Sequence, residues 1–199
     1  MSIANYFTFV RIVISPIFLF VYLEHDNLGI SAIALPYILM ILLGTSELSD
    51  AFDGYLARRY NQVTDLGKVL DPMADSIARI SVFLTFTLDP VNLPMPLIFI
   101  FLYRDSVVST LRTICALKGF ALAARQSGKI KAVIQGLAAL LVLILMIPYA
   151  EGTLSKETLH TSGTAIVGAA ALYTIYSGVD YITANWTYIS KLLYPNRTT

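Results

Sequence analysis

Six long apolar stretches constrain the fold of this chain more than any other feature. They cover residues 6–23, 29–44, 67–88, 93–117, 130–149 and 161–181. Each is close to the length of about 20 residues that an α-helix needs to cross the hydrocarbon core of a bilayer. The composition agrees, since 14% of the 199 residues are charged, whereas about a quarter are charged in a soluble domain. We therefore expect an all-α, polytopic integral membrane protein with six transmembrane helices, in a single domain of residues 1–199.

The first two stretches extend this prediction. The run at 6–23 is long for the core of a signal peptide, so we interpret it as a retained span. Arg11 lies near the end of that span, where a long side chain can reach the membrane interface. We expect the second helix to continue past its apolar part through Arg59.

Two pairs of aspartates flank the junction between the second and third stretches. Asp50 and Asp53 lie three residues apart, and the second pair, Asp71 and Asp75, lies four apart. On a helix, either spacing places both side chains on one face. A turn around residues 61–67 can bring the pairs together. Four carboxylates in a dry place need a cation to stay ionised, and hard oxygen ligands suit Mg²⁺, Mn²⁺ or Ca²⁺. A solvated acidic face is the alternative, which the apolar flanks disfavour because ionisable groups are rare at membrane depth.

The residues around the aspartates carry a family resemblance. The pattern is Asp50-xx-Asp53-Gly54-xx-Ala57-Arg58, then eight residues, then Gly67-xxx-Asp71-xxx-Asp75. In every fixed position it resembles the signature of the CDP-alcohol phosphotransferases, which are integral membrane enzymes that join a CDP-linked lipid to an alcohol and release CMP. The resemblance implies that Mg²⁺ or Mn²⁺, as two ions, is held by the carboxylates of Asp50, Asp53, Asp71 and Asp75. It also implies that Asp75 is the catalytic base.

Small residues and a guanidinium surround the first aspartate pair. Gly54 and Ala57 lie on the helical face near these carboxylates and leave room for a ligand, and Arg58 is a forked donor suited to phosphate. We expect CDP-diacylglycerol to be bound by Asn5, Thr8, Gly54, Ala57, Arg58 and Thr64. Helix capping is the alternative role of Asn5 and Thr8.

A second group of candidate site residues consists of basic side chains. Arg104 and Arg112 are eight residues apart and share one helix face, while Lys129 and Lys131 begin the fifth stretch. Charges inside a span normally face the protein interior or a wet cavity. We interpret these four residues as a pocket for the phosphate of the second substrate. Two alternatives remain open: Arg104 pairs with Asp105 or with one of the four aspartates, and the lysines only contact lipid headgroups and set topology.

Further segments narrow the resemblance to the phosphatidylglycerophosphate synthase branch of this family. They are residues 5–11, 103–112, 123–131 and 177–181. This branch uses glycerol 3-phosphate as acceptor, and the resemblance assigns Arg104, Arg112, Lys129 and Lys131 to its phosphate. The chain departs from the branch at two places. The branch commonly has Gly-Arg-Glu where this chain has Tyr103-Arg104-Asp105, and it often has lysine where this chain has Ser76.

The charges of the predicted loops indicate an orientation. Basic residues gather after the second and fourth stretches, and acidic residues after the first, third and fifth. The positive-inside rule therefore places the basic loops, both termini and the aspartates on the cytoplasmic side. By resemblance we expect a bacterial inner membrane and a homodimer. The sixth stretch is rich in glycine and alanine, which permits close packing either within the monomer or across a dimer.

Other functions are compatible with parts of this pattern. The same chemistry with inositol phosphate, serine or a second lipid as acceptor is the nearest alternative, although an acceptor without phosphate leaves the basic set without a role. A divalent-cation transporter and a non-catalytic membrane scaffold are two further classes. No basic tail accompanies the formal charge of +1, so we expect no nucleic-acid partner.

Overall fold

The computed structural model describes residues 3–59, 65–117, 119, 122 and 125–193, and the side chains of these residues apart from 3–7, 50–51, 53–59, 65–71 and 191–193. The described residues form α-helices and no strand, as the all-α prediction requires. The helices are α1 Ile3–Glu24, α2 Ala34–Arg59, α3 Asp65–Thr85, α4 Met95–Leu117, α5 Gln126–Ala150, α6 Lys156–Ala184 and α7 Trp186–Leu193.

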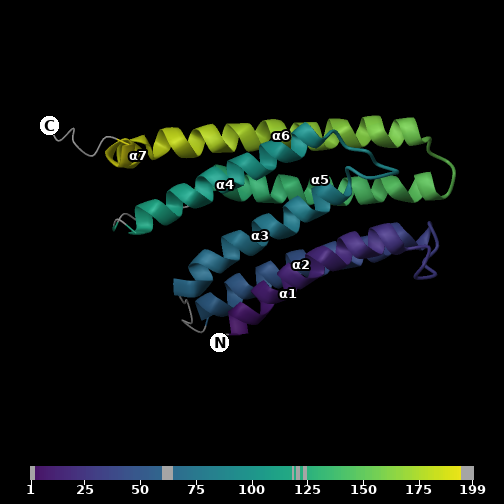
Figure 1. Ribbon diagram of the computed structural model, residues 1–199, viewed down its shortest axis with the longest axis horizontal. Coiled ribbons are helices and arrows are strands. Elements are labelled where there is room, and N and C mark those ends of the chain that lie inside the picture. Colours follow the sequence, from purple (N-terminus) through teal and green to yellow (C-terminus); the bar gives the residue numbers. More distant parts are fainter. Residues whose placement is uncertain (1–2, 60–64, 118, 120–121, 123–124, 194–199) are drawn as a thin grey trace.

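Helices α1 to α6 run alternately in opposite directions along one bundle (Figure 1). As a result, the C-terminal ends of α2, α4 and α6 and the N-terminal ends of α1, α3 and α5 lie at the same end, on the left of the figure. We call it the aspartate end, because Asp50 and Asp53 lie in the C-terminal part of α2 and Asp71 lies in the N-terminal part of α3, one turn before Asp75 at the middle of that helix. The prediction that the second helix continues through Arg59 is confirmed.

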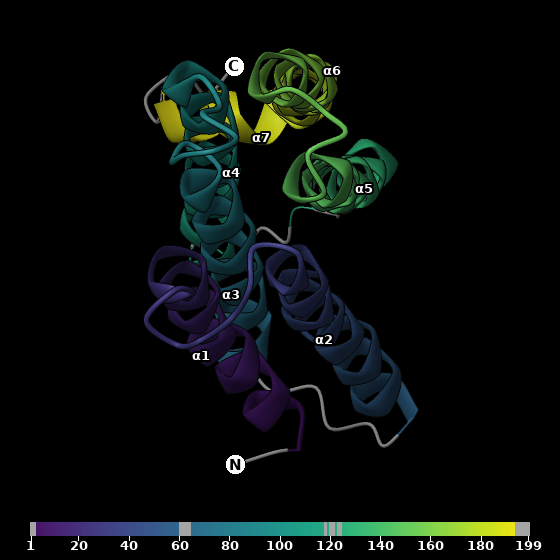
Figure 2. The ribbon, with the colours of Figure 1, turned by 90° about the vertical axis from the view of Figure 1, so that its right-hand side faces the viewer.

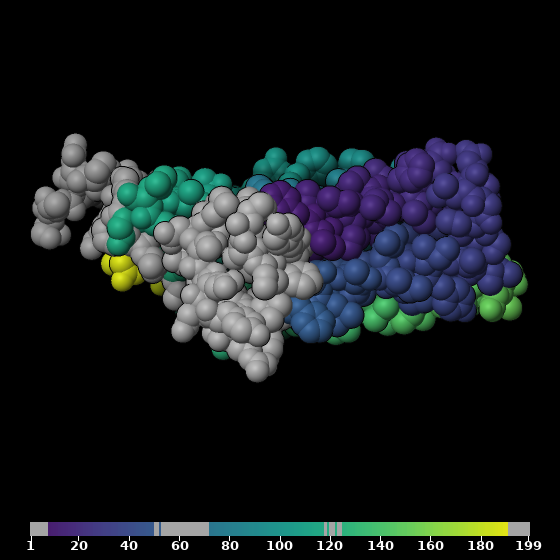
Figure 3. Space-filling model, turned by 90° about the horizontal axis from the view of Figure 1, so that it is seen from below, coloured from purple at the N-terminus to yellow at the C-terminus, as the bar shows by residue number. Residues whose placement is uncertain are grey.

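The bundle has two groups of three helices, and α3 connects them. Helix α1 packs against α2 and α3, α5 packs against α6 and α2, and α4 packs against α6 and α3. Viewed along the bundle, α1 to α3 form one group and α4 to α6 the other (Figure 2). The face formed by α1 and α2 is seen in Figure 3. Two aromatic pairs fix the C-terminal end of α3 between its neighbours. The ring centroid of Phe83 lies 4.8 Å from that of Phe101 in α4, and Phe86, which directly follows α3, lies 6.1 Å from Phe18 of α1. Such aromatic pairs each contribute about 0.5–1.5 kcal/mol beyond burial.

Two helices in the described residues, α5 and α6, are both long and apolar enough to cross a membrane. Their outer faces carry large exposed apolar side chains, such as Val133 and Leu137 on α5 and Leu172 on α6. Helices α1 to α4 contain 22, 26, 21 and 23 residues. At 1.5 Å per residue each of them is about 30 Å long or more, the thickness of a hydrocarbon core. The number of spans remains a prediction.

The chain ends in a short helix that the apolar pattern does not predict. Asn185 interrupts α6, and its buried side-chain amide donates to the carbonyl oxygen of Tyr181 at 2.8 Å. The chain then turns and α7 crosses from α6 to α4 at the aspartate end (Figure 2). Trp186 and Tyr188, at the start of α7, are exposed. The helix is eight residues long, too short to be recognised from hydropathy alone.

Candidate active site

A pocket of about 240 Å³ opens at the aspartate end between α3, α4 and α5. We call it the basic pocket, because six basic side chains and two carboxylates are among the described residues that line it. The charged residues are Asp75, Arg79, Arg104, Asp105, Arg112, Arg125, Lys129 and Lys131. Arg104, Arg112, Lys129 and Lys131, which the sequence grouped together, thus share one cavity with Asp75. This excess of positive charge favours an anionic ligand.

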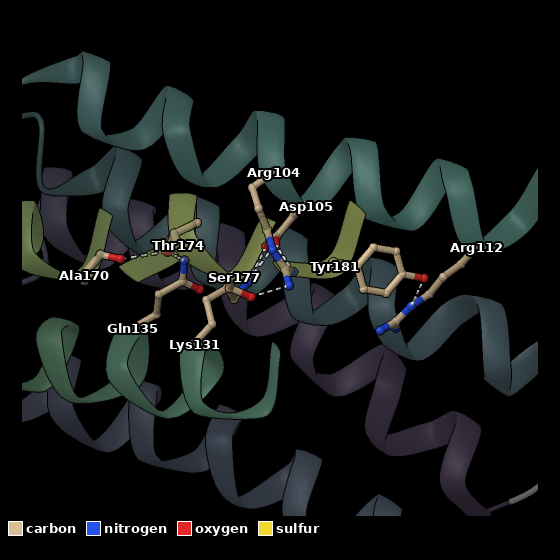
Figure 4. A network of polar contacts seen from close by, with 9 residues as sticks. All are labelled: Arg104, Asp105, Arg112, Lys131, Gln135, Ala170, Thr174, Ser177 and Tyr181. Carbon is tan, nitrogen blue, oxygen red and sulfur yellow. Dashed lines mark hydrogen bonds and ion pairs between the residues drawn. The ribbon is translucent and has the colours of Figure 1, made fainter. Parts of the chain in front are cut away.

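A buried carboxylate joins two of the predicted cations. Asp105 accepts hydrogen bonds from Lys131 Nζ at 2.7 and 2.9 Å and from Arg104 Nη1 at 2.9 Å. Arg104 Nη2 also donates to Ser177 Oγ of α6 at 2.8 Å, so the four side chains converge from three helices (Figure 4). Their position also follows from small residues: a Cβ at Gly178 would lie 3.2 Å from Arg104 Cγ. The pairing of Arg104 with Asp105 is therefore present, and both residues still line the pocket.

A second group of polar contacts lies one turn further along α5 and α6. Gln135 Nε2 donates to Thr174 Oγ1 at 3.1 Å, and the Thr174 hydroxyl donates to the carbonyl oxygen of Ala170 at 2.8 Å (Figure 4). Both side chains are buried. The bond from Gln135 to Thr174 links α5, which carries Lys131, to α6, which carries Ser177, whereas the bond from Thr174 to Ala170 lies within α6.

The remaining two predicted cations have different surroundings. The Arg112 guanidinium lies 5.3 Å from the ring centroid of Tyr181, and its Nε donates to the Tyr181 hydroxyl at 3.3 Å. Lys129 is exposed at the start of α5. Within the described part of the chain, neither cation forms an ion pair with a carboxylate. Both therefore keep charge available for an anion in the pocket.

Arg125 is a further basic residue at the rim, which the sequence placed before the fifth stretch without giving it a role. Its Nε and Nη2 donate to Asp180 at 3.1 and 2.7 Å. These hydrogen bonds raise the pKa of Arg125 above its ordinary value, so the side chain stays charged. Ser127 donates to the same carboxylate. Asp180 thereby ties the start of α5 to the end of α6 beside the pocket.

Asp75 forms an ion pair with Arg11, a residue for which the sequence predicted a different position. Arg11 of α1 is 1% exposed and its Nη1 forms an ion pair with Asp75 Oδ1. The interpretation of Arg11 as a side chain that reaches the membrane interface is wrong. Arg11 lies on the face of α1 that packs against α3, so its guanidinium turns inward, where a carboxylate compensates the buried charge.

Most of the predicted metal and lipid-substrate residues fall outside the described side chains. These are Asp50, Asp53 and Asp71 for the metal, and Asn5, Gly54, Ala57 and Arg58 for CDP-diacylglycerol; Thr64 lies outside the described residues altogether. Thr8 is described and is 1% exposed inside α1, beyond the position of a helix cap. Among the residues whose side chains are described, no group of three His, Cys, Asp or Glu could hold a metal. The donor set still suits Mg²⁺ or Mn²⁺, because all four predicted ligands are carboxylates, carried by two helices that follow one another in the chain.

The described residues form an all-helical bundle in which two helices are long and apolar enough to cross a membrane, and six basic side chains and two carboxylates line a pocket in it. The chain belongs to the CDP-alcohol phosphatidyltransferases, whose family model matches residues 1–177.

Three relatives illustrate the similarity. A CDP-diacylglycerol–glycerol-3-phosphate 3-phosphatidyltransferase of Rickettsia typhi is 31% identical over 94% of this chain and 98% of its own. Its namesake in Bacillus subtilis is 29% identical over 93% and 95%. A probable phosphatidylglycerophosphate synthase of Mycobacterium tuberculosis is 30% identical over 91% and 80%. The resemblance drawn from the aspartate pattern is confirmed.

Proposed function

We propose that this protein transfers the phosphatidyl group from CDP-diacylglycerol to sn-glycerol 3-phosphate, giving phosphatidylglycerophosphate and CMP in phospholipid biosynthesis. The observation that carries the proposal is the basic pocket, where six basic side chains and two carboxylates lie beside one another. The names of the relatives, which specify this reaction, support the same acceptor.

The acceptor phosphate is assigned to Arg104, Arg112, Lys129 and Lys131. Arg104 and Lys131 are oriented by Asp105, so their positions are set before the ligand binds. Arg112 and Lys129 supply charge that no carboxylate in the described residues neutralises. A phosphate dianion suits such a site, because guanidinium and ammonium donors form strong charge-assisted hydrogen bonds to its oxygens. An acceptor without a phosphate group, such as serine, would leave Arg112 and Lys129 without a phosphate to bind.

Asp75 is proposed as the base. It lines the same pocket as the acceptor residues, and the ion pair with Arg11 orients its carboxylate. In the reaction, Asp75 accepts the proton from the 1-hydroxyl of glycerol 3-phosphate as that oxygen attacks the β-phosphorus of CDP-diacylglycerol. The bond between the β-phosphorus and the bridging oxygen breaks, and CMP leaves with the α-phosphate.

The first substrate is assigned to the aspartate-bearing ends of α2 and α3 and to the start of α1. Bound to Asp50, Asp53, Asp71 and Asp75, two Mg²⁺ or Mn²⁺ ions would supply charge neutralisation for the diphosphate and the leaving CMP. The residues proposed to bind CDP-diacylglycerol are Asn5, Thr8, Gly54, Ala57, Arg58 and Thr64. Thr8 is buried in α1, three residues before Arg11, which contacts Asp75.

The proposed setting is the inner membrane of a bacterium, with α1 to α6 as six spans of a single domain of residues 1–199. The aspartate end and both termini would face the cytoplasm, where the loops are basic. There a lipid substrate can enter from the bilayer and a soluble acceptor from water. A homodimer is part of the proposal, by analogy with the family.

Release of CMP tests the reaction. Purified protein in detergent micelles is given CDP-diacylglycerol and Mn²⁺ or Mg²⁺, and acceptors are added one at a time. We expect release with glycerol 3-phosphate, loss of release in EDTA, and loss in Asp75→Asn. Release only with inositol phosphate, serine or phosphatidylglycerol would contradict the acceptor while keeping the chemistry. No release with any acceptor, from protein that unfolds cooperatively, would favour a transporter or a scaffold.

A further inference from the structure

Arg79 of α3 lies where three cavities meet. It lines the basic pocket and a small interior cavity between α1, α2, α3 and α5. It also lines a groove of about 550 Å³ between α2 and α5, whose walls are apolar residues such as Met40 and Leu140. Arg79 follows Asp75 by four residues in the same helix, so the two side chains leave one face of α3. The guanidinium is therefore on the side of the bundle where the reaction is proposed.

The guanidinium of Arg79 is only loosely compensated. Its side chain is 14% exposed, and its Nε lies 3.7 Å from Glu47 Oε1, too far for a hydrogen bond. The buried Nε has no hydrogen-bond partner in the described part of the chain. The side chain of Glu47 is 41% exposed. It lies against Gly136 of α5, where an added Cβ would be 3.7 Å from the Glu47 carboxyl carbon. A buried donor without a partner is costly, and a ligand oxygen would remove that cost.

We propose that Arg79 is a further phosphate-binding residue of this active site, held by Glu47 at the junction between the basic pocket and the α2–α5 groove. The inference rests on the proposed function and adds a residue to it. A guanidinium has five donors in a planar fork that matches phosphate oxygens. Two sources of phosphate can reach this point. The phosphate of the soluble acceptor comes from the basic pocket, and the diphosphate of the lipid substrate comes with a lipid that lies along the groove.

The kinetic test compares Arg79→Gln, Arg79→Lys and the double variant Arg79→Gln/Glu47→Gln with the wild-type protein. Charge-assisted hydrogen bonds to phosphate predict an increase of about 10- to 100-fold in one KM for Arg79→Gln and a smaller one for Arg79→Lys. An increase in the KM for glycerol 3-phosphate identifies the acceptor, and an increase in the KM for CDP-diacylglycerol identifies the lipid. Lys156→Gln, which removes an exposed cation at the opposite end of the bundle, is the matched control and should change neither KM.

The double variant separates ligand binding from a structural ion pair. If Arg79 and Glu47 only stabilise the fold, removing both charges should restore the wild-type KM. If Arg79 binds phosphate, the double variant keeps the high KM of Arg79→Gln. Restoration, or unchanged KM values in Arg79→Gln, overturns the proposal.

Thermal unfolding with ligand keeps the test independent of turnover. Glycerol 3-phosphate or CDP-diacylglycerol should raise the unfolding temperature of the wild-type protein, and Arg79→Gln should lose that increase for one of the two. This result in a protein that releases no CMP would sustain Arg79 as a phosphate ligand and refute the proposed reaction. Equal stabilisation of wild type and variant by both ligands would refute the role of Arg79 and leave the reaction standing.

Discussion

Asp105 is the position at which removal of one charge should have the largest effect. Its carboxylate accepts two hydrogen bonds from Lys131 and one from Arg104, at 2.7 to 2.9 Å. The side chains of Lys131, Asp105 and Arg104 are 4%, 11% and 12% exposed, so the ion pairs are buried. Breaking a buried ion pair from one side costs about 3–5 kcal/mol, because a charge is left without compensation. Asparagine keeps the shape and one acceptor oxygen, so we expect Asp105→Asn to cost about 3 kcal/mol.

The loss of stability in Asp105→Asn can be followed through Cys115, the only cysteine of the chain, which is buried in α4. A fluorogenic thiol dye reacts with it only when the fold opens. A loss of about 3 kcal/mol should lower the midpoint of thermal unfolding in detergent by about 6–12 °C, given about 2–4 °C per kcal/mol for a chain of this size. Glu151→Gln is the matched control, because it removes an exposed carboxylate directly after α5 and should change the midpoint little.

A second substitution shows whether an uncompensated cation causes the loss. Lys131→Met removes the ammonium group and keeps an apolar side chain of similar length, so Asp105→Asn/Lys131→Met should be more stable than Asp105→Asn alone. A midpoint for Asp105→Asn within about 2 °C of the wild type, which is below 1 kcal/mol, would refute the reasoning. So would a double variant that is no more stable than the single one.

Two further predictions concern a glycine and a surface ion pair. Gly178→Ala should raise the KM for glycerol 3-phosphate several-fold, because the new Cβ would lie 3.2 Å from Cγ of Arg104. Gly168→Ala is the control and should leave this KM unchanged, because a Cβ at Gly168 would have no atom within 4 Å. The hydrogen bond from Lys156 lowers the pKa of Asp89 below its ordinary value. The unfolded state therefore binds this proton more readily, so the contribution of the pair to stability is complete well above about pH 4 and is lost as the pH falls below it. Thermal unfolding of wild type and Asp89→Asn should converge at low pH, and a constant difference would contradict the shift.

Several features could be predicted because they depend on local sequence. The long apolar stretches predict helices, and the expectation that the second helix continues past its apolar part through Arg59 is met by α2. The alternation of acidic and basic loops predicts that the C-terminal ends of the second, fourth and sixth helices lie on one side, and Figure 1 shows the ends of α2, α4 and α6 at the same end of the bundle. The grouping of Arg104, Arg112, Lys129 and Lys131 is also matched by a common pocket.

Contacts between side chains of different helices could not be predicted, because they depend on how the helices pack. Arg11 was misread because its distance from the chain terminus says nothing about the side of α1 that packs against α3, where Asp75 compensates it. The pairing of Arg104 with Asp105 was one of the alternatives that the sequence left open. The role of Ser177 was missed, since its hydrogen bond to Arg104 links α6 to α4 across 73 residues of sequence.

The sequence by itself predicted the six long helices, because apolar length acts over a few turns of one helix, and the motif around the aspartates indicated the family. That the four aspartates hold a divalent metal stays a prediction. Only the tertiary structure decided how the charges are paired: Asp75 with Arg11, Asp105 with Arg104 and Lys131, and Glu47 loosely with Arg79. The physical reason is that a buried charge is stable only beside its counter-charge. The partner comes from whichever helix packs there, and residues far apart in the chain then share one pocket.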